Sequence, residues 1–280
     1  MSASRYDMQN LKDATTHFAF GENWSRYLEC VDETRISEAE KGLLRLIQVD
    51  ELKGKSLLDI GCGSGLHSLA ALRLGARLVV AIDIDQTSVS TTQKLLDRFA
   101  GGANYTVQTQ SVFDIQTAPS DNFDIVYSWG VLHHTGAMRE AIAHAAKSVK
   151  PGGYFVFALY RKTMMCGVWK YIKRWYAHTS RGHQQTARAI YLTLLKLRYK
   201  LGGKDLEAYK ENHVSSRGMS FDHDVHDWLG GYPYESILPQ EVSQLMEHLN
   251  FSHIRSNIHP GGIGLFGSGC DEYVFVKTVA

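Results

Sequence analysis

Short apolar segments alternate with amphipathic segments along the middle of the chain. In the amphipathic segments, apolar residues recur every three or four positions, as on one face of a helix. Repeated alternation of nearly continuous apolar strands with helices predicts a parallel sheet covered by helices on both faces. The predicted strands are 56–60, 77–83, 104–110, 123–129 and 153–160, and the predicted helices between them end at Leu74 or span 87–100 and 138–149.

The pattern changes after residue 160 and returns near the end of the chain. Residues 186–201 have helical character, and Pro239 introduces a further helix, 239–250. Two more strands, 251–258 and 272–279, follow it. The chain is therefore predicted to be one α/β domain with a seven-stranded sheet and a helical insertion after the fifth strand. The predicted parts are an N-terminal helical segment (1–50), a core (51–160), a basic helical insertion (161–235) and a final helix with a strand hairpin (236–280).

Composition and charge narrow the class of protein. The formal net charge is +1, which argues against a global attraction to nucleic acid or membrane. The four cysteines are far apart and form no CxxC pair, so we expect free thiols in a reducing compartment. The N-terminal stretch has no apolar signal-peptide core, and no apolar run is long enough for a membrane span. A cytoplasmic protein is predicted.

The glycine-rich stretch LLDIGCGSG, residues 57–65, follows the first strand directly. Gly61, Gly63 and Gly65 allow the backbone to turn sharply and a ligand to approach without meeting a Cβ atom. The helix that begins behind this loop offers unpaired N–H groups. In a doubly wound sheet, such a loop lies at the carboxyl ends of the strands, where ligands bind.

Two features distinguish the possible ligands of this loop. The spacing is G-x-G-x-G, whereas dinucleotide-binding proteins use G-x-G-x-x-G. Asp59, two positions before the first glycine, suits an ammonium group better than a pyrophosphate, and Asp83 ends the second strand, where a carboxylate can accept hydrogen bonds from ribose hydroxyls. S-adenosylmethionine has an amine, a ribose and no phosphate. A nicotinamide-dependent oxidoreductase is the weaker alternative.

The sequence resembles the class I S-adenosylmethionine-dependent methyltransferases. The stretches LLDIGCGSG, VVAIDID, FDIVYSWGVLHHT and VKPGGYFVFALY match the motifs of that family in order. The resemblance covers roughly residues 40–160 and is closest to the group that contains the ubiquinone-pathway O-methyltransferases. It implies a Rossmann-like, mostly parallel sheet and S-adenosylmethionine as cofactor.

The resemblance also implies which residues bind the cofactor. Asp59 and the glycines at 61, 63 and 65 would hold its methionine part, and Asp83 with Ile84 would hold the ribose. Val112 and Phe113 would flank the adenine. Two further residues within the matched motifs are counted as cofactor-binding: Cys62 and Trp129.

Catalysis requires a group that removes a proton from a hydroxyl or ammonium acceptor. His133 and His134 follow the fourth strand and are candidates for this base, with structural hydrogen bonding as the other interpretation. Tyr232 and Glu235, in the segment 221–235, are further candidates. That segment either closes over the substrate or forms a surface loop. No metal site is predicted, because His223 and His226 lack a third cluster of ligands.

The insertion is strongly basic. Residues 161–204 contain eleven Lys or Arg, no Asp or Glu, and interleaved aromatic residues. Such a segment could be a lid that attracts an acidic or phosphorylated small molecule, a dimer interface, a partner for acidic residues elsewhere, or an RNA-binding surface. A membrane surface is disfavoured, because the sequence shows no long basic amphipathic face.

These observations predict an S-adenosylmethionine-dependent methyltransferase that acts on oxygen or nitrogen of a small acceptor, as a monomer or homodimer. One alternative is an RNA-modifying methyltransferase. Another is a non-catalytic S-adenosylmethionine-binding interaction protein, which the cofactor motif alone does not exclude.

Overall fold

The computed structural model shows seven strands joined in one sheet. It describes residues 17–18, 20–115, 122–203, 205–207, 209–210, 221–260, 262–267 and 269–279. The strand order is β3-β2-β1-β4-β5-β7-β6. Their bounds are β1 Ser56–Ile60, β2 Leu78–Asp83, β3 Tyr105–Thr109, β4 Phe123–Trp129, β5 Val149–Tyr160, β6 Phe251–Asn257 and β7 Cys270–Lys277.

The sheet is mostly parallel. β1 pairs in parallel with both β2 and β4, so that Leu58 lies between Val80 and Val126. β7 alone runs against its neighbours β5 and β6. The strand order reverses between β1 and β4, which places a ligand-binding crevice at the carboxyl ends of these two strands. The predicted seven-stranded α/β fold is confirmed, and each predicted strand is present within a few residues.

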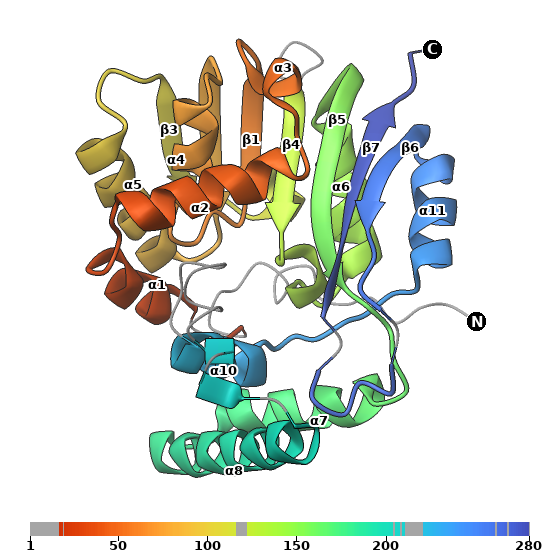
Figure 1. Ribbon diagram of the computed structural model, residues 1–280. Helices are drawn as coiled ribbons and strands as arrows, with labels where there is room; N and C mark the ends of the chain where they lie inside the picture. The colour runs from red at the N-terminus through yellow and green to blue at the C-terminus, as the bar shows by residue number, and fades with distance from the viewer. Residues whose placement is uncertain are drawn as a thin grey trace.

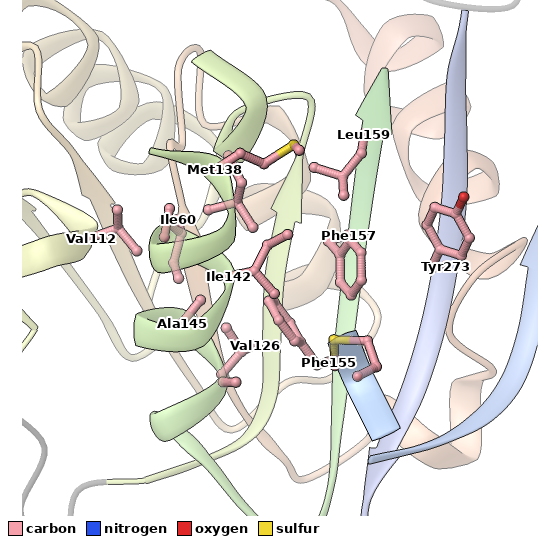
Figure 2. Packing of buried hydrophobic residues seen from close by; sticks show 14 of the residues in the cluster. Ile60, Val112, Val126, Met138, Ile142, Ala145, Phe155, Phe157, Leu159 and Tyr273 are labelled. Carbon is pink, nitrogen blue, oxygen red and sulfur yellow. The ribbon is translucent and has the colours of Figure 1, made fainter. Parts of the chain in front are cut away.

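Two helices cover one face of the sheet. α6 (Met138–Lys147) and α11 (Pro239–His248) bury their apolar residues against β4, β5 and β7. Figure 2 shows Met138 of α6 directed toward Leu159 of β5, and Ile142 of α6 directed toward Phe157. Phe155 and Phe157 lie next to one another on β5, with ring centroids 4.6 Å apart. This cluster anchors the strand that leads into the insertion.

Three helices cover the opposite face. They are α2 (Glu33–Leu44), α4 (Leu66–Arg73) and α5 (Gln86–Phe99), and their buried residues pack on β1, β2 and β4. The short helices α3 (Val49–Leu52) and α1 (Phe20–Leu28) complete the N-terminal part. α1 lies beyond the strand ends, next to α5 (Figure 1).

The insertion forms a helical lid with its own small core. α7 (Cys166–His178), α8 (Arg181–Leu201) and α10 (Phe221–Gly230) lie together beyond the ends of the strands (Figure 1). Their shared cluster includes Trp169, Tyr176, Leu195 and Leu229. The segment 221–235 therefore begins as a helix that packs on α7 and α8, rather than as a surface loop.

α8 begins five residues before the predicted start at 186. The hydroxyl of Ser180 accepts a hydrogen bond from the backbone N–H of His183 and so caps the helix. A separate finding concerns hydropathy: in the part of the chain that the structure describes, no helix has the length and apolar content needed to cross a bilayer.

Candidate functional site

A large cavity lies between the carboxyl ends of the strands, α1 and the lid. Its volume is about 1550 Å³, above the roughly 300–1,000 Å³ of ordinary small-molecule pockets. It has room for two ligands. Ten of the predicted site residues line it: Gly61, Cys62, Gly63, Asp83, Ile84, Val112, Phe113, Trp129, His133 and His134.

The glycine loop forms the floor of the cavity at the end of β1. Gly61 has φ +77°, and a Cβ atom there would lie 2.4 Å from the side chain of Val131. Gly63 has φ +55°, and a Cβ atom there would lie 3.0 Å from the indole nitrogen of Trp24. Larger residues at these positions would require an unfavourable backbone and would fill the space above the loop.

Asp83 ties the glycine loop to the end of β2. Its carboxylate accepts hydrogen bonds from the backbone N–H groups of Gly63, at 3.0 Å, and Asp85, at 2.9 Å. Burial raises the pKa of Asp83 to about 6, although these hydrogen bonds oppose the shift. A carboxylate has about four lone-pair sites, so Asp83 can still accept hydrogen bonds from hydroxyl groups of a ligand in the cavity.

Asp59 and Gly65 lie behind the loop and are not part of the cavity lining. The carboxylate of Asp59 accepts a hydrogen bond of 2.6 Å from the hydroxyl of Ser68. Burial raises the pKa of Asp59 to about 7, and the nearby Asp83 adds to the rise. Gly65 begins α4 with φ +79°. Asp59 is therefore placed to influence a ligand in this cavity through its charge and not through direct contact.

An apolar slot follows the ends of β2 and β3. Ile84, Val112 and Phe113 line it, and Val112–Asp114 forms a single 3₁₀ turn. The hydroxyl of Ser111 accepts a hydrogen bond from the N–H of Phe113 and holds this turn. The slot suits a flat, weakly polar ring.

The cavity lining also contains residues that the sequence analysis did not predict as site residues. Glu272 on β7 accepts hydrogen bonds from the indole of Trp129, at 2.7 Å, and from Asn257, at 3.0 Å. Arg45 lies 4.0 Å from the same carboxylate. His67 also lines the cavity, and burial lowers its pKa to about 4. No local motif marks these residues, because they come from parts of the chain that meet only in the folded structure.

The two histidines are buried and differ in their hydrogen bonds. Nδ1 of His134 donates to the carbonyl of Pro233 at 2.7 Å, which leaves the Nε2 lone pair of the neutral ring available. Nδ1 of His133 accepts a 3.4 Å hydrogen bond from the N–H of Tyr160, and its Nε2 has no partner among the described residues. That pairing puts the proton of a neutral His133 on Nε2.

Burial keeps both histidines neutral. It lowers the pKa of His134 to about 3 and the pKa of His133 well below its usual range. The fully buried Lys173 adds to both shifts. Its ammonium donates to the carbonyl of Trp228 and lies 3.6 Å from the centroid of that indole ring.

Tyr232 and Glu235 are not part of the cavity lining. A carboxylate oxygen of Glu235 accepts a 2.8 Å hydrogen bond from the N–H of Met138 and so caps α6. The N–H of Glu235 donates to the carbonyl of His133 at 3.0 Å. The ring of Tyr232 lies against His178, with centroids 5.6 Å apart. Glu235 thus connects the insertion to α6 and to the turn that holds His133, whereas the Tyr232 ring packs within the insertion.

The lid side of the cavity is mainly aromatic. Tyr160, Tyr191, Tyr199, Trp228 and Phe266 line it. Of the basic residues of 161–204 that the structure describes, Arg198 is the one in the lining, and its guanidinium lies 4.9 Å from the Phe266 ring centroid.

The sequence analysis predicts no metal site. Across the described residues, no group of three His, Cys, Asp or Glu is placed to hold a metal ion. The side chain of His223 lies outside that description.

One known protein family has a sequence profile that matches this chain. The sequence profile of a family described as a methyltransferase domain matches residues 31–196. The chain belongs to this family. The match takes in the methyltransferase domain from α2 through the glycine loop and the histidines to most of α8.

Individual relatives are similar to this methyltransferase domain over shorter stretches. A ubiquinone biosynthesis O-methyltransferase of Methylobacterium sp. (strain 4-46) is 32% identical over 115 residues, 41% of this chain and 45% of that protein. A tRNA U34 carboxymethyltransferase of Hydrogenovibrio crunogenus is 37% identical over 111 residues, 39% of this chain and 33% of that protein. The matches thus span less than half of these curated relatives.

Solved structures share the fold. The magnesium protoporphyrin IX methyltransferase of Synechocystis PCC 6803, solved with bound S-adenosylhomocysteine, aligns over 97% of this chain and 100% of its own. The TM-score is 0.57 at 18% sequence identity. This likeness confirms the Rossmann-like architecture.

Proposed function

We propose that this chain binds S-adenosylmethionine and transfers its methyl group to an oxygen or nitrogen atom of a small acceptor. One observation carries the proposal. A single cavity brings the glycine loop and Asp83 together with the histidine pair, beneath an aromatic lid. The family membership and the motif order support it.

The residues of the cavity fit that cofactor. The bare backbone at Gly61 and Gly63 leaves room for its methionine part, and Asp83 can accept hydrogen bonds from the ribose hydroxyls. The slot around Val112 and Phe113 suits the adenine. Arg45, missed from sequence, offers a cation for the cofactor carboxylate. When bound, S-adenosylmethionine supplies an electrophilic methyl group on a sulfonium.

The histidines have different roles in the proposal. His134 receives the proton that the acceptor loses, because Pro233 holds the ring proton on Nδ1 and leaves the Nε2 lone pair available. The Nε2 atom of His133 is buried beneath the cavity surface, so His133 acts by holding the His134 ring, 4.4 Å away between centroids, in position for the transfer. His133 is a positioning residue, and His134 is the base.

The lid indicates the class of acceptor. Aromatic rings such as Tyr191 and Trp228 favour a flat or apolar body, and Arg198 favours an acidic or phosphorylated group on it. The placement of most other basic residues outside the cavity lining makes a highly charged acceptor less suitable. The proposed reaction takes place in the cytoplasm, with the chain as a monomer or homodimer.

RNA as the acceptor is the second candidate, and a specific observation favours it. One relative is named for a tRNA nucleotide, and residues 161–204 are basic. The aromatic lining of the cavity favours the small acceptor instead. A protein that binds S-adenosylmethionine without transfer is distinguished by binding in the absence of turnover.

Calorimetric titration tests the cofactor assignment. Purified protein is expected to bind S-adenosylmethionine and S-adenosylhomocysteine but not NADH. Asp83→Asn replaces a carboxylate oxygen with a donor that cannot accept the loop N–H or ribose hydrogen bonds, so affinity is expected to fall at least tenfold. An unchanged dissociation constant in a folded variant would remove Asp83 from the site, and binding of NADH alone would overturn the proposal.

Steady-state kinetics test the base once methyl uptake by an acceptor is found. His134→Gln is expected to lower kcat by about 100-fold or more, with unchanged binding of S-adenosylhomocysteine. His133→Gln, the matched control, keeps a polar side chain beneath His134 and is expected to lower kcat by less than about tenfold. Because burial lowers the pKa of His134 to about 3, its protonation should limit the rate only below about pH 4. Full turnover of both variants would eliminate this assignment.

A further inference from the structure

The outer face of α8 carries an apolar stripe that the lid core does not use. Its members are spaced four, three and four residues apart, which aligns them on one side of a helix. Each is more than half exposed: Ile190, Leu194, Leu197 and Leu201. Leu195 is buried in the lid cluster and Tyr191 packs against it, so the stripe faces away from that cluster.

α7 and the turn before it repeat this arrangement. Met164, Val168, Tyr171 and Trp175 have the same spacing, and each is at least 46% exposed. The opposite side of α7 is fully or nearly buried and carries Trp169, Lys173 and Tyr176. Helices α7 and α8 lie at the end of the molecule farthest from the sheet (Figure 1), and we call their two stripes together the outer lid surface.

Positive charges border both stripes. At about 100° per residue, Lys170 and Arg174 lie along one side of the α7 stripe, and Lys196 and Lys200 lie in the same position relative to the α8 stripe. All four are exposed. Because residues 161–204 contain no Asp or Glu, no acidic residue of α7 or α8 themselves neutralises these charges.

We propose that the outer lid surface docks on a membrane surface that contains anionic lipids. Exposed Trp, Tyr, Leu and Ile side chains on one face of a helix, bordered by Lys and Arg, are typical of helices that lie in the interfacial plane of a bilayer. The apolar stripes enter the headgroup boundary, and the bordering cations meet lipid phosphates. The chain binds the surface without crossing it.

The charge pattern argues against two other occupants. A second copy of the chain would bring the same cations against one another across the stripe. RNA would be expected to meet aromatic rings on which bases can stack; the α7 stripe offers Tyr171 and Trp175, but the α8 stripe is entirely aliphatic. Aliphatic side chains gain most from hydrocarbon. The docking is independent of the proposed methyl transfer and can be measured without an acceptor.

Vesicle co-sedimentation tests the proposal with the full chain. Vesicles of phosphatidylcholine with about one third phosphatidylglycerol are expected to sediment the protein at least ten times better than vesicles of phosphatidylcholine alone. Salt at about 0.5 M should weaken this binding, because it screens the cations. Brominated lipids should quench part of the tryptophan fluorescence, and Trp175→Phe should remove most of that quenching.

Charge-matched variants separate stripe insertion from simple attraction. Leu194→Glu/Leu197→Glu places two charges on the α8 stripe, and Gln185→Glu/Ala189→Glu places two on exposed positions away from it. The stripe variant is expected to lose vesicle binding at least tenfold more than the control variant. Thermal unfolding and calorimetry with S-adenosylhomocysteine check that both variants are folded.

The proposal is overturned by any of four results: no binding to anionic vesicles, equal losses in the two variants, displacement from vesicles by single-stranded RNA at equal phosphate concentration, or a wild-type dimer that the stripe variant alone converts to monomer. The last result would assign the surface to a second copy of the chain.

Discussion

The buried carboxyl group of Asp59 is expected to make two quantities depend on pH: the free energy of unfolding and the affinity for a cationic ligand. Its pKa is about 7 in the ligand-free protein, against about 3.9 in an unfolded chain. The folded chain therefore holds more protons than the unfolded chain between about pH 4 and 7. The contribution of Asp59 to the free energy of unfolding is complete at low pH and is lost as the pH rises through 7.

A cationic ligand should reverse this preference, because a nearby positive charge favours the ionised carboxylate. We expect binding of S-adenosylmethionine at pH 6.5 to release protons and its affinity to rise between pH 6 and 8. Calorimetry in two buffers of different ionisation enthalpy measures the release.

Asp59→Asn is the matched variant, since its amide oxygen can still accept the hydrogen bond from Ser68. Proton release should fall to less than half in this variant, with the remainder coming from Asp83. If release is unchanged, the ligand charge does not act on Asp59.

At the scale of elements, Glu235 joins two parts of the chain that are far apart in sequence. Its carboxylate caps α6 at Met138, and its backbone N–H holds the carbonyl of His133. A side-chain cap of this kind contributes about 0.5–2 kcal/mol. Burial also raises the pKa of Glu235, as expected for a carboxyl enclosed between the lid and the sheet.

Two substitutions distinguish a cap from a base at this position. Glu235→Gln retains an acceptor for the Met138 N–H and should keep at least a third of wild-type kcat. Glu235→Ala removes the cap and should lower the free energy of unfolding by about 1 kcal/mol in urea. A glutamine variant that folds but loses turnover 100-fold would show that Glu235 takes part in proton transfer.

On the scale of the whole molecule, the cofactor site and the lid rest on different cores. The proposed cofactor residues follow β1, β2 and β4, whereas α7, α8 and α10 share a separate cluster around Trp169. The indole of Trp169 also donates to the carbonyl of Gly264, at 2.7 Å. Substitutions that weaken the packing of the lid are therefore expected to leave the glycine loop folded.

Trp169→Ala tests this division. Removal of a buried tryptophan is expected to cost about 3–5 kcal/mol, concentrated in the lid. Binding of S-adenosylhomocysteine should stay within threefold of wild type, while turnover of an acceptor falls steeply. Hydrogen exchange would locate the loss of protection in α7, α8 and α10. A tenfold loss of S-adenosylhomocysteine affinity would show that the two parts act as one unit.

The sequence by itself determined the sheet, the glycine loop and most of the cofactor end of the cavity. Strands β1 and β4 begin and end where the apolar pattern predicts. These features are local: a strand, the turn that follows it and the residue that ends the next strand stand within about thirty positions, and their physical requirements are met by neighbours in the chain.

Only the tertiary structure decided the rest of the site. Arg45, Glu272 and Trp129 meet through contacts between distant segments, and Glu235 became a helix cap through a partner nearly a hundred residues away. The proposal that His134 is the base depends on its hydrogen bond to the carbonyl of Pro233, which is far away in the sequence. The basic amphipathic faces of α7 and α8 could be recognised only from the structure, because the structure defines where each helix begins and ends and which of its sides is buried.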